Sequence, residues 1–169
     1  MAIVRLGVKR EEAIELLREA SEALRAQYGD RIVAVGLFGS VARGEAGERS
    51  DVDVLVVVRD WPGGLERRRQ LYKILHSYLG GDVTLIDVDY GVAVELAEGR
   101  RPLYSTMLNI LYDCVIVYDP EGVLARLKKA VLRVVEEHGL IRVKHGRAYY
   151  WTRRDGRPLI QVRGGAQPS

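Results

Sequence analysis

Apolar positions along the chain fall into two kinds of run, which predict different elements. Ile14, Leu17 and Leu24 form one apolar stripe at helical spacing and predict a helix over residues 9–27. Short and nearly continuous apolar runs instead predict buried strands. Such strands are expected at residues 32–38, 52–58, 83–88 and 115–118.

Longer stretches with helical spacing separate these strands. They are expected at residues 65–79, 92–98, 102–112 and 119–139. Pro102 suits the first turn of a helix, and Asp119 and Glu121 would place acidic groups at the positive end of the helix that they open. Up to Gly139 the order is α-β-α-β-α-β-α-α-β-α, which predicts an α/β or α+β domain.

Composition excludes several classes of protein. With 169 residues, 47% of them hydrophobic and 29% charged, the chain suits a single globular domain with an apolar core. It has no apolar run long enough for a membrane span, and the first ten residues lack the apolar stretch of a secretory signal. Cys114 is the only cysteine, which excludes an internal disulfide and a cysteine-based zinc site. These features predict a cytoplasmic protein with no membrane association.

Charge divides the chain where the helical pattern ends. Residues 1–139 hold 19 Lys and Arg against 22 Asp and Glu, whereas residues 140–169 hold seven against one. We therefore expect one domain over residues 1–139 and a small basic extension over residues 140–169. Within the extension, strands at 148–152 and 159–162 are expected to join through a turn at Asp155-Gly156. The extension either meets an anionic partner or is a solvated terminal segment.

The stretch between the first two strands holds residue types that suit a phosphate group. Gly39 ends the first strand and, having no side chain, allows a ligand close to the backbone. Backbone N–H groups at the start of a helical turn favour phosphate, and Ser40 adds a hydroxyl donor. Arg43 follows one turn later, where a cation can meet a polyphosphate. Each residue alone is typical of an ordinary turn, so it is their order between two buried strands that indicates a phosphate site.

Two aspartates begin the second strand. Asp51 and Asp53 are two residues apart, so a strand places both carboxylates on one face while Val52 and Val54 point into the core. Two such close negative charges repel unless a cation lies between them, and Mg²⁺ suits a site of oxygen ligands and phosphates. The sequence therefore predicts a dicarboxylate metal site beside the phosphate site.

Together these residues resemble the signature of the DNA polymerase β nucleotidyltransferase superfamily, in which Gly-Ser is followed after a ten-residue gap by Asp-x-Asp. The longer form, Gly-Ser-x-Ala-Arg-Gly with Ser-Asp-x-Asp, is similar to the minimal nucleotidyltransferase branch. The matching positions are Gly39, Ser40, Ala42, Arg43, Gly44, Ser50, Asp51 and Asp53. The motif covers residues 32–58, and a weaker similarity to archaeal members with a C-terminal extension continues beyond residue 102.

The resemblance implies a polymerase β-like fold, with a mixed β-sheet flanked by helices over residues 1–139. The residues that it implies for the nucleotide are Gly39, Ser40, Arg43 and Ser50, and those for two Mg²⁺ ions are Asp51 and Asp53. Two metals clamp the attacking and leaving oxygens of an in-line displacement. An acceptor hydroxyl would attack the α-phosphorus of an NTP, with ATP expected as the donor of AMP, and pyrophosphate would leave.

The resemblance also implies a partner protein. Members of this branch are often paired with a HEPN-domain RNase toxin, which they neutralise by forming a complex and by adenylylating a tyrosine. A HEPN-domain partner and an antitoxin role are therefore expected. Two alternatives remain: a catalytically weak or inactive nucleotide-binding module that neutralises its partner by contact, and an RNA-binding protein that acts through the basic extension. The sequence leaves open whether the chain forms an oligomer.

Active members of the superfamily usually carry a third carboxylate on the next core strand. The strand that follows here has Thr84 where that acid is expected. Asp82 lies two residues earlier on the same face and is the candidate for the third catalytic carboxylate beside the Asp-x-Asp pair. Asp87 and Asp89 are expected on the opposite face of a regular strand. The alternative is that no third acid exists and that catalysis is weakened or absent.

Aromatic and cationic residues alternate in the extension. Tyr149, Tyr150 and Trp151 lie among the arginines and the lysine of residues 142–157, a composition typical of contact with RNA or of a protein interface. The simplest alternative is a small hairpin that packs Tyr149 or Trp151 onto the body. A run of three arginines at residues 67–69 is expected to form a solvated helix face.

Overall fold

The computed structural model describes residues 8–48, 50–157 and 159. In chain order the elements are α1 Arg10–Tyr28, the 3₁₀ turn η1 Gly29–Arg31, β1 Ile32–Phe38, α2 Gly39–Ala42, β2 Val52–Val58, α3 Leu65–Leu79, β3 Val83–Asp89, α4 Tyr90–Ala97, α5 Ser105–Tyr112, β4 Val115–Tyr118, α6 Val123–Glu137, β5 Leu140–His145 and β6 Ala148–Arg153. The four strands predicted before Gly139 are all present, which confirms the apolar runs as strands.

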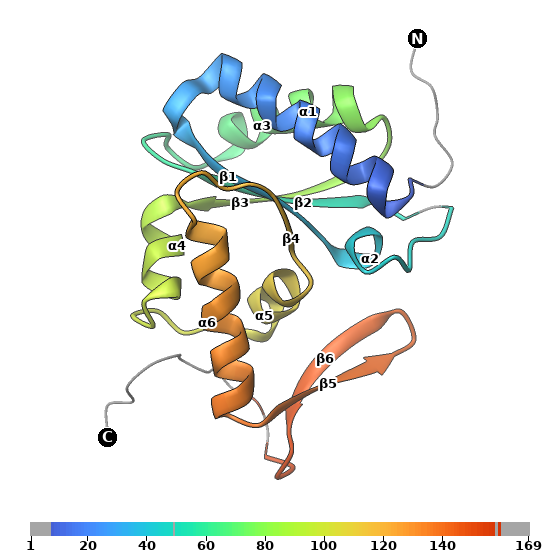
Figure 1. Cartoon of the computed structure of the whole chain (residues 1–169), viewed down its shortest axis with the longest axis vertical. Helices are drawn as coiled ribbons and strands as arrows, with labels where there is room; N and C mark the ends of the chain where they lie inside the picture. Colours follow the sequence, from blue (N-terminus) through green and yellow to red (C-terminus); the bar gives the residue numbers. More distant parts are fainter. Residues whose placement is uncertain (1–7, 49, 158, 160–169) are drawn as a thin grey trace.

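A four-stranded sheet in the order β3-β2-β1-β4 forms the centre of the fold (Figure 1). β2 is parallel to β3 and antiparallel to β1, and β4 is antiparallel to β1, so the sheet is mixed. Helices α1 and α3 cover one face, while α4, α5 and α6 cover the other (Figure 1). This arrangement confirms the predicted mixed sheet flanked by helices.

Alternation along β2 sends its side chains into both layers. Val52 and Val54 pack in the cluster that includes α1 and α3, whereas Leu55 packs in the cluster that includes α5 and α6. All three side chains are buried, which confirms the predicted inward direction of the two valines. By the same alternation Asp53 falls on the face of α5 and α6, opposite Thr84 in the parallel register with β3.

Two helices begin later than the sequence predicts. α5 starts at Ser105 and leaves Pro102 outside, with the buried Leu103 and the extended Tyr104 between them. α6 starts at Val123, and the Asp119 carboxylate accepts hydrogen bonds at 3.2 and 3.0 Å from two N–H groups of its first turn. The predicted acidic group at the positive end of α6 is therefore confirmed at Asp119.

A separate two-stranded sheet follows α6. β5 and β6 pair antiparallel through a tight turn in which Gly146 has a φ of +63°. The strand predicted at residues 148–152 is present as β6, but it pairs with the preceding segment, which was not predicted as a strand. Of the second predicted strand, Leu159 is not in a strand, and residues 160–162 lie outside the described residues.

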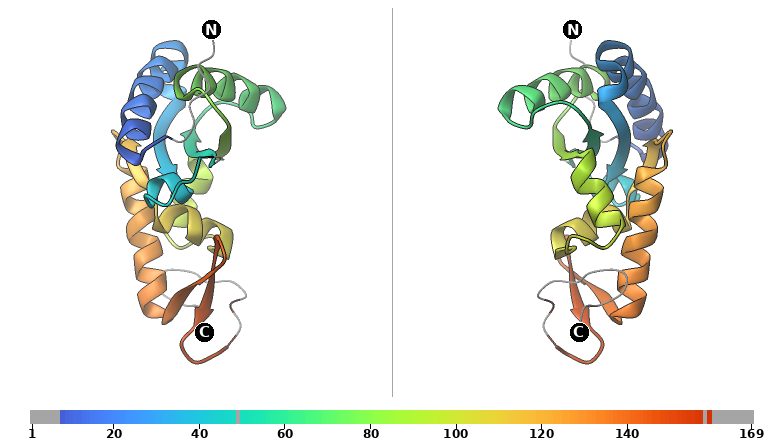
Figure 2. Two further views of the ribbon diagram at one scale, coloured as in Figure 1. Left: turned by 90° about the vertical axis from the view of Figure 1, so that its right-hand side faces the viewer. Right: turned by 90° about the vertical axis from the view of Figure 1, so that its left-hand side faces the viewer.

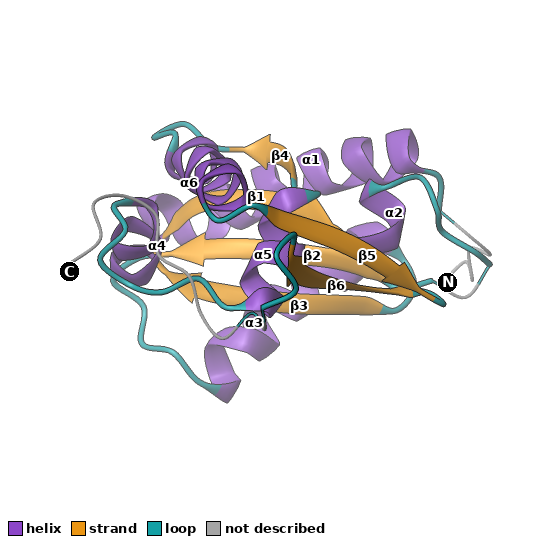
Figure 3. Ribbon diagram, turned by 90° about the horizontal axis from the view of Figure 1, so that it is seen from below, coloured by secondary structure: helices purple, strands orange, loops and turns teal. Residues whose placement is uncertain are grey.

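The hairpin lies on the face of the sheet that α5 and α6 cover (Figure 3). Figure 2 shows it extending from the lower end of α6, with α5 between it and the four-stranded sheet. Trp151 is only 5% exposed, and its indole N–H donates to Asn109 Oδ1 of α5 at 2.8 Å. The prediction that a hairpin packs an aromatic residue onto the body is confirmed.

Among the described residues, no helix has the length and apolar character that crossing a membrane would require.

Candidate functional site

The turn after β1 brings the glycine of the motif against the second aspartate. Phe38, the last residue of β1, pairs with Asp53 of β2. Gly39 follows with a φ of +76°, a conformation that residues with a Cβ rarely adopt. A Cβ atom at Gly39 would lie 1.9 Å from Asp53 Oδ2. The sequence predicted that Gly39 makes room for a ligand, and the structure adds that the Asp53 carboxylate itself needs this space.

The two aspartates differ in burial. Asp51 precedes β2 and is exposed, whereas Asp53 lies in the strand and is half-buried. Thr84 of β3 donates its hydroxyl to Asp51 Oδ2 at 3.1 Å. Burial and, next, the negative charge of Asp51 raise the pKa of Asp53 to about 6, although hydrogen bonding by Thr84 and the charge of Arg43 act in the opposite direction. The pair therefore lacks enough nearby positive charge to stabilise both ionised carboxylates.

The donor chemistry of this pair fits a divalent cation. Carboxylate oxygens are ligands of hard cations such as Mg²⁺, and a cation beside them would relieve the repulsion that helps to raise the pKa of Asp53. In the part of the chain that the structure describes, no three side chains of His, Cys, Asp or Glu gather as a metal-ligand group. Further ligands would have to come from water or phosphate oxygens, which is common for Mg²⁺.

Thr84, rather than a third carboxylate, completes the group around the aspartates. Thr84 pairs with Asp53 in the register between β2 and β3. Asp82 precedes β3 with an exposed side chain, and its backbone carbonyl accepts the N–H of Val52 at 3.0 Å. The backbone of Asp82 thus adjoins the start of β2, but its carboxylate is not gathered with the pair into a group of three.

The two serines of the motif stabilise the loop between α2 and β2. The carbonyl of Ser40 accepts the N–H of Glu45 at 2.9 Å. The hydroxyl of Ser50 accepts the N–H of Gly47 at 2.9 Å, and the N–H of Ser50 donates to the carbonyl of Gly47 at 3.2 Å. Ser50 therefore closes the turn that leads into Asp51, a structural contact that motif spacing did not predict.

Arg43 already has protein partners. Its Nε donates to Glu45 Oε2 at 3.1 Å, and its Nη1 donates to Asp113 Oδ2 at 3.2 Å. Its guanidinium carbon lies 4.6 Å from the ring centroid of Tyr149 in β6. Sequence reasoning missed Glu45 and Asp113, because neither stands at a motif position and Asp113 reaches Arg43 only through the tertiary fold.

The aromatic residues of the extension do not share one surface. Tyr149 faces inward, and its hydroxyl donates to Glu45 Oε1 at 2.7 Å. Trp151 is buried, whereas Tyr150 is 51% exposed on the other face of β6. The segment that suggested an RNA contact is therefore divided between an inner face turned to the body and an outer face in solvent.

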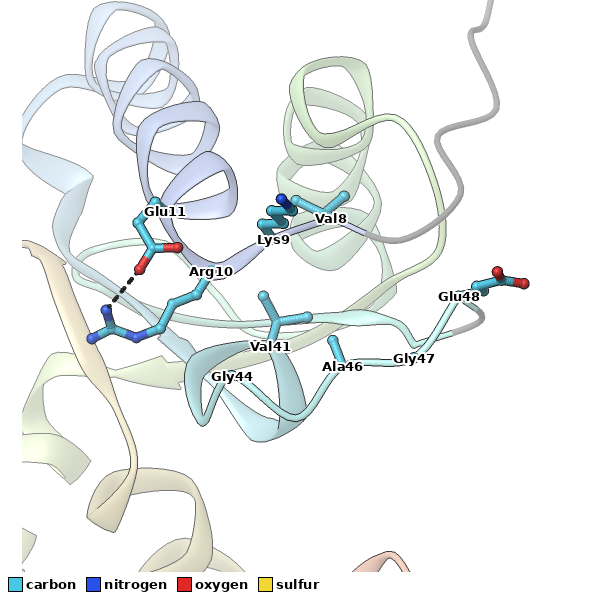
Figure 4. A pocket seen from close by; sticks show the side chains of 9 residues that line it. All are labelled: Val8, Lys9, Arg10, Glu11, Val41, Gly44, Ala46, Gly47 and Glu48. Atoms are coloured by element: carbon cyan, nitrogen blue, oxygen red, sulfur yellow. Dashed lines mark ion pairs between the residues drawn. The ribbon is translucent and has the colours of Figure 1, made fainter.

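A pocket lies on the outer side of the loop between α2 and β2 (Figure 4). It has a volume of about 370 Å³, and its described lining consists of Val8, Lys9, Arg10, Glu11, Val41, Gly44, Ala46, Gly47 and Glu48. Arg10 and Glu11 form an ion pair at 3.6 Å, and Arg10 also donates to the carbonyl of Ala42 at 3.0 Å. The bond to Ala42 joins the start of α1 to the end of α2, and neither aspartate of the pair is part of the described lining.

The expectation that residues 67–69 form a solvated helix face is wrong for Arg67, which is buried. Its side chain is only 4% exposed, and it donates to Asp87 at 2.8 Å and to Asp89 at 2.7 Å. It also donates to the carbonyl of Trp61 at 2.6 Å. Asp87 and Asp89 therefore lie on the face of α3, opposite to Asp53, as their place in β3 predicts. The two acids make Arg67 a buried ion-pair partner instead of a surface charge.

Comparison with known proteins identifies relatives over the region that contains the motif. A profile of the nucleotidyltransferase domain matches residues 17–104. A provisionally named protein adenylyltransferase of Methanocaldococcus jannaschii is 31% identical, over 70% of this chain and 83% of its own. The protein adenylyltransferase MntA of Thermococcus cleftensis is 40% identical, over 45% of this chain and 74% of its own. A crystal structure of a toxin–antitoxin complex with AMP-PNP aligns with a TM-score of 0.49 and 16% identity, over 71% of this chain and 87% of its own.

Proposed function

Because the chain belongs to the nucleotidyltransferase domain family, we propose that it transfers AMP from ATP to a hydroxyl group of a partner protein. The observation that carries the proposal is the contact between the Asp53 carboxylate and the turn at Gly39, with Asp51 beside it. This contact joins the phosphate-binding part of the motif to the candidate metal ligands. The names of the two relatives given above support a protein as the acceptor and AMP as the group transferred.

The proposed roles follow from the donor types. The backbone at Gly39 and the hydroxyl of Ser40 bind phosphate oxygens of the nucleotide, as the motif implies. Asp51 and Asp53 hold Mg²⁺, with two ions implied by the resemblance, and the metal supplies positive charge to the phosphates when bound. Arg43 adds a positive charge beside the phosphates, as the motif implies, and the same charge lowers the pKa of Asp53. Ser50 shapes the turn into Asp51.

The proposed reaction is an in-line displacement at the α-phosphorus. The acceptor oxygen forms a bond to this phosphorus, and the bond between the α-phosphorus and the bridging oxygen to the β-phosphate breaks. Pyrophosphate leaves with that bonding electron pair, and the acceptor hydroxyl releases its proton. The protein contributes by positioning the reactants and by stabilising the charge that develops.

The proposed acceptor is a tyrosine hydroxyl of a HEPN-domain toxin, which makes this chain an antitoxin. The support is the resemblance of the Gly-Ser-x-Ala-Arg-Gly motif to the branch that is often paired with such toxins. Purification of this chain from the cells that naturally express it, with mass spectrometry of the copurifying proteins, would test this part of the proposal. Recovery of this chain without any HEPN-domain protein would contradict it.

One observation favours a second candidate, a nucleotide-binding module that neutralises its partner by contact alone. Thr84 occupies the position of the expected third acid, and the exposed Asp82 carboxylate is not gathered with the pair. In this alternative the chain still binds ATP, but it transfers AMP slowly or not at all.

Intact-mass measurement separates the two candidates. The chain and its copurified partner are incubated with ATP and Mg²⁺, and the Asp51→Ala/Asp53→Ala variant serves as the control. A gain of one or more AMP units that the control lacks would support the transferase and identify the acceptor. ATP binding by calorimetry without any mass gain, in a sample shown to contain the partner, would contradict the transferase and support the binding module.

A further inference from the structure

The hairpin of β5 and β6 contacts the motif loop through Tyr149. The hydroxyl of Tyr149 donates to Glu45, two residues after Arg43. The ring of the same tyrosine lies under the guanidinium of Arg43, at 4.6 Å. Glu45 and Arg43 also bond to each other at 3.1 Å. Tyr149 therefore contacts two of the first three residues after α2, with its ring on Arg43 and its hydroxyl on Glu45.

A second arginine, from the neighbouring strand of the same hairpin, also contacts the ring of Tyr149. The guanidinium carbon of Arg142 in β5 lies 4.3 Å from the ring centroid of Tyr149 and 4.7 Å from that of Tyr112. Arg142 also forms an ion pair with Asp113, the same carboxylate that accepts from Arg43. The side chains of Arg43, Asp113 and Arg142 are all mostly buried. The tyrosine ring thus contacts two arginines that share one carboxylate.

We propose that Tyr149 is a positioning residue of the nucleotide site, because it fixes Arg43 and with it the turn that contains Gly39 and Ser40. This inference rests on the proposed function and extends the site beyond the matched domain, which ends at residue 104. Arg43 is one turn from Gly39, and its N–H donates to the carbonyl of Gly39 at 3.1 Å. The backbone of Arg43 is therefore bonded to the turn, while its side chain is held by Tyr149, Glu45 and Asp113.

Fixing this arginine in advance favours nucleotide binding. A free arginine side chain loses rotamer entropy when it is ordered. In this chain two carboxylates and a ring already order it before any nucleotide binds. The bond from Tyr149 is also the largest influence that lowers the pKa of Glu45. Without Tyr149 the cost of ordering would fall on the binding step.

Three variants separate the contributions of Tyr149, and the hairpin offers a matched control. Tyr149→Phe keeps the ring in contact with the two arginines and removes only the bond to Glu45. Tyr149→Leu removes both the ring and the hydroxyl. Tyr150→Leu makes the same change at the next residue, whose side chain faces solvent. Thermal unfolding of each variant shows whether its hairpin remains packed.

The test is a double-mutant cycle of ATP affinity, measured by calorimetry on the full chain with Mg²⁺. We expect Tyr149→Leu to raise the Kd for ATP about tenfold, Tyr149→Phe to raise it less, and Tyr150→Leu to leave it within about twofold of the unmodified chain. If Tyr149 acts through Arg43, then Arg43→Ala/Tyr149→Leu binds ATP no more weakly than Arg43→Ala alone. In the transfer assay, the same loss should appear in KM for ATP while kcat is largely retained.

Each outcome decides between positioning and a purely structural role. Unchanged ATP affinity in Tyr149→Leu, or fully additive losses in the double variant, would overturn the inference. If Tyr149→Leu unfolds, the same cycle with Tyr149→Phe and Glu45→Gln tests the hydroxyl contact in a folded protein, and additive losses there overturn it as well. ATP binding without AMP transfer in the unmodified chain would refute the proposed transferase. The role of Tyr149 would then be decided by the Kd values for ATP alone. A chain that does not bind ATP would refute both.

Discussion

The chain has two pairs of aspartates at the same spacing, on neighbouring parallel strands, and they lie in opposite electrostatic surroundings. Asp87 and Asp89 of β3 face α3, where Arg67 donates to both. Asp51 and Asp53 at the start of β2 have the hydroxyl of Thr84 beside them, and the charge of Arg43 offsets their repulsion only in part. Hydrogen bonds and the charge of Arg67 hold the pKa of Asp87 below its usual value against the effect of burial, whereas the pKa of Asp53 is raised to about 6.

The difference shows what distinguishes a candidate metal site from a structural ion pair. Aspartates at i and i+2 occur in both pairs, so the spacing alone does not separate them. What separates them is the presence of a protein cation. Where arginines are present, both carboxylates already have a protein cation as partner and hold α3 against β3. Where the positive charge of nearby arginine is insufficient, as at Asp51 and Asp53, the carboxylates remain able to bind a cation that arrives with a nucleotide.

The largest expected effect is on transfer. Asp53→Asn should lower AMP transfer by about a thousandfold or more, because it removes a proposed metal ligand at the reacting phosphate. Asp87→Asn, measured at a temperature at which it is folded, should transfer AMP at nearly the rate of the unmodified chain. Initial rates from AMP-labelled partner check both variants. Equal losses in the two variants would show that the pairs are not functionally distinct.

Stability should respond in the reverse order. Asp87→Asn leaves the buried Arg67 without its ionised partner at Asp87 and should cost about 3 kcal/mol of unfolding free energy. Asp89→Asn is the matched control, because the Asp89 side chain is 58% exposed and its pair with Arg67 should be worth about 1 kcal/mol or less. Urea unfolding of both variants measures the difference. A smaller loss in Asp87→Asn than in Asp89→Asn would contradict the structural role of the buried pair.

These contrasts also show which parts of the site could be predicted from sequence. The four strands of the central sheet, the turn at Gly39 and the shared face of Asp53 and Thr84 follow from local patterns of apolar residues and from the period of a strand. The burial of Arg67 could not be predicted from its neighbours in sequence, since its partners lie on β3 and it is one of three adjacent arginines. The contact between Tyr149 and Glu45 depends on how the hairpin folds back, for which a single sequence offers no spacing rule.

The pH dependence of the two pairs should have opposite signs. The raised pKa of Asp53 means that the folded chain holds this proton more tightly than the unfolded chain. The contribution of Asp53 to stability therefore falls as the pH rises from about 4 to about 6. The lowered pKa of Asp87 means that its contribution is present above about 4 and is lost as the pH falls below that value.

Magnesium makes this contrast measurable at the proposed site. Because Mg²⁺ competes with the proton for Asp53, its affinity should increase as the pH rises through about 6. Saturating Mg²⁺ should raise the Tm by about 2–4 °C at pH 7.5 and by less at pH 5. Scanning calorimetry with and without Mg²⁺ checks this, and Asp53→Asn should show no such pH-dependent shift. A shift of equal size in that variant would assign the metal to another site.

The smallest expected effect concerns Thr84, which stands where a third carboxylate is expected in active relatives. Thr84→Val keeps the shape of the side chain but removes the hydroxyl that donates to Asp51 and that helps to lower the pKa of Asp53. The pKa of Asp53 should therefore rise further, and the pH at which Mg²⁺ begins to stabilise the chain should move upward with it. Thr84→Ser keeps the hydroxyl and is the control. NMR titration of the Asp53 carboxyl carbon checks the direction, and an unchanged or lower pKa in Thr84→Val would mean that Asp53 is controlled by burial and by Asp51 alone.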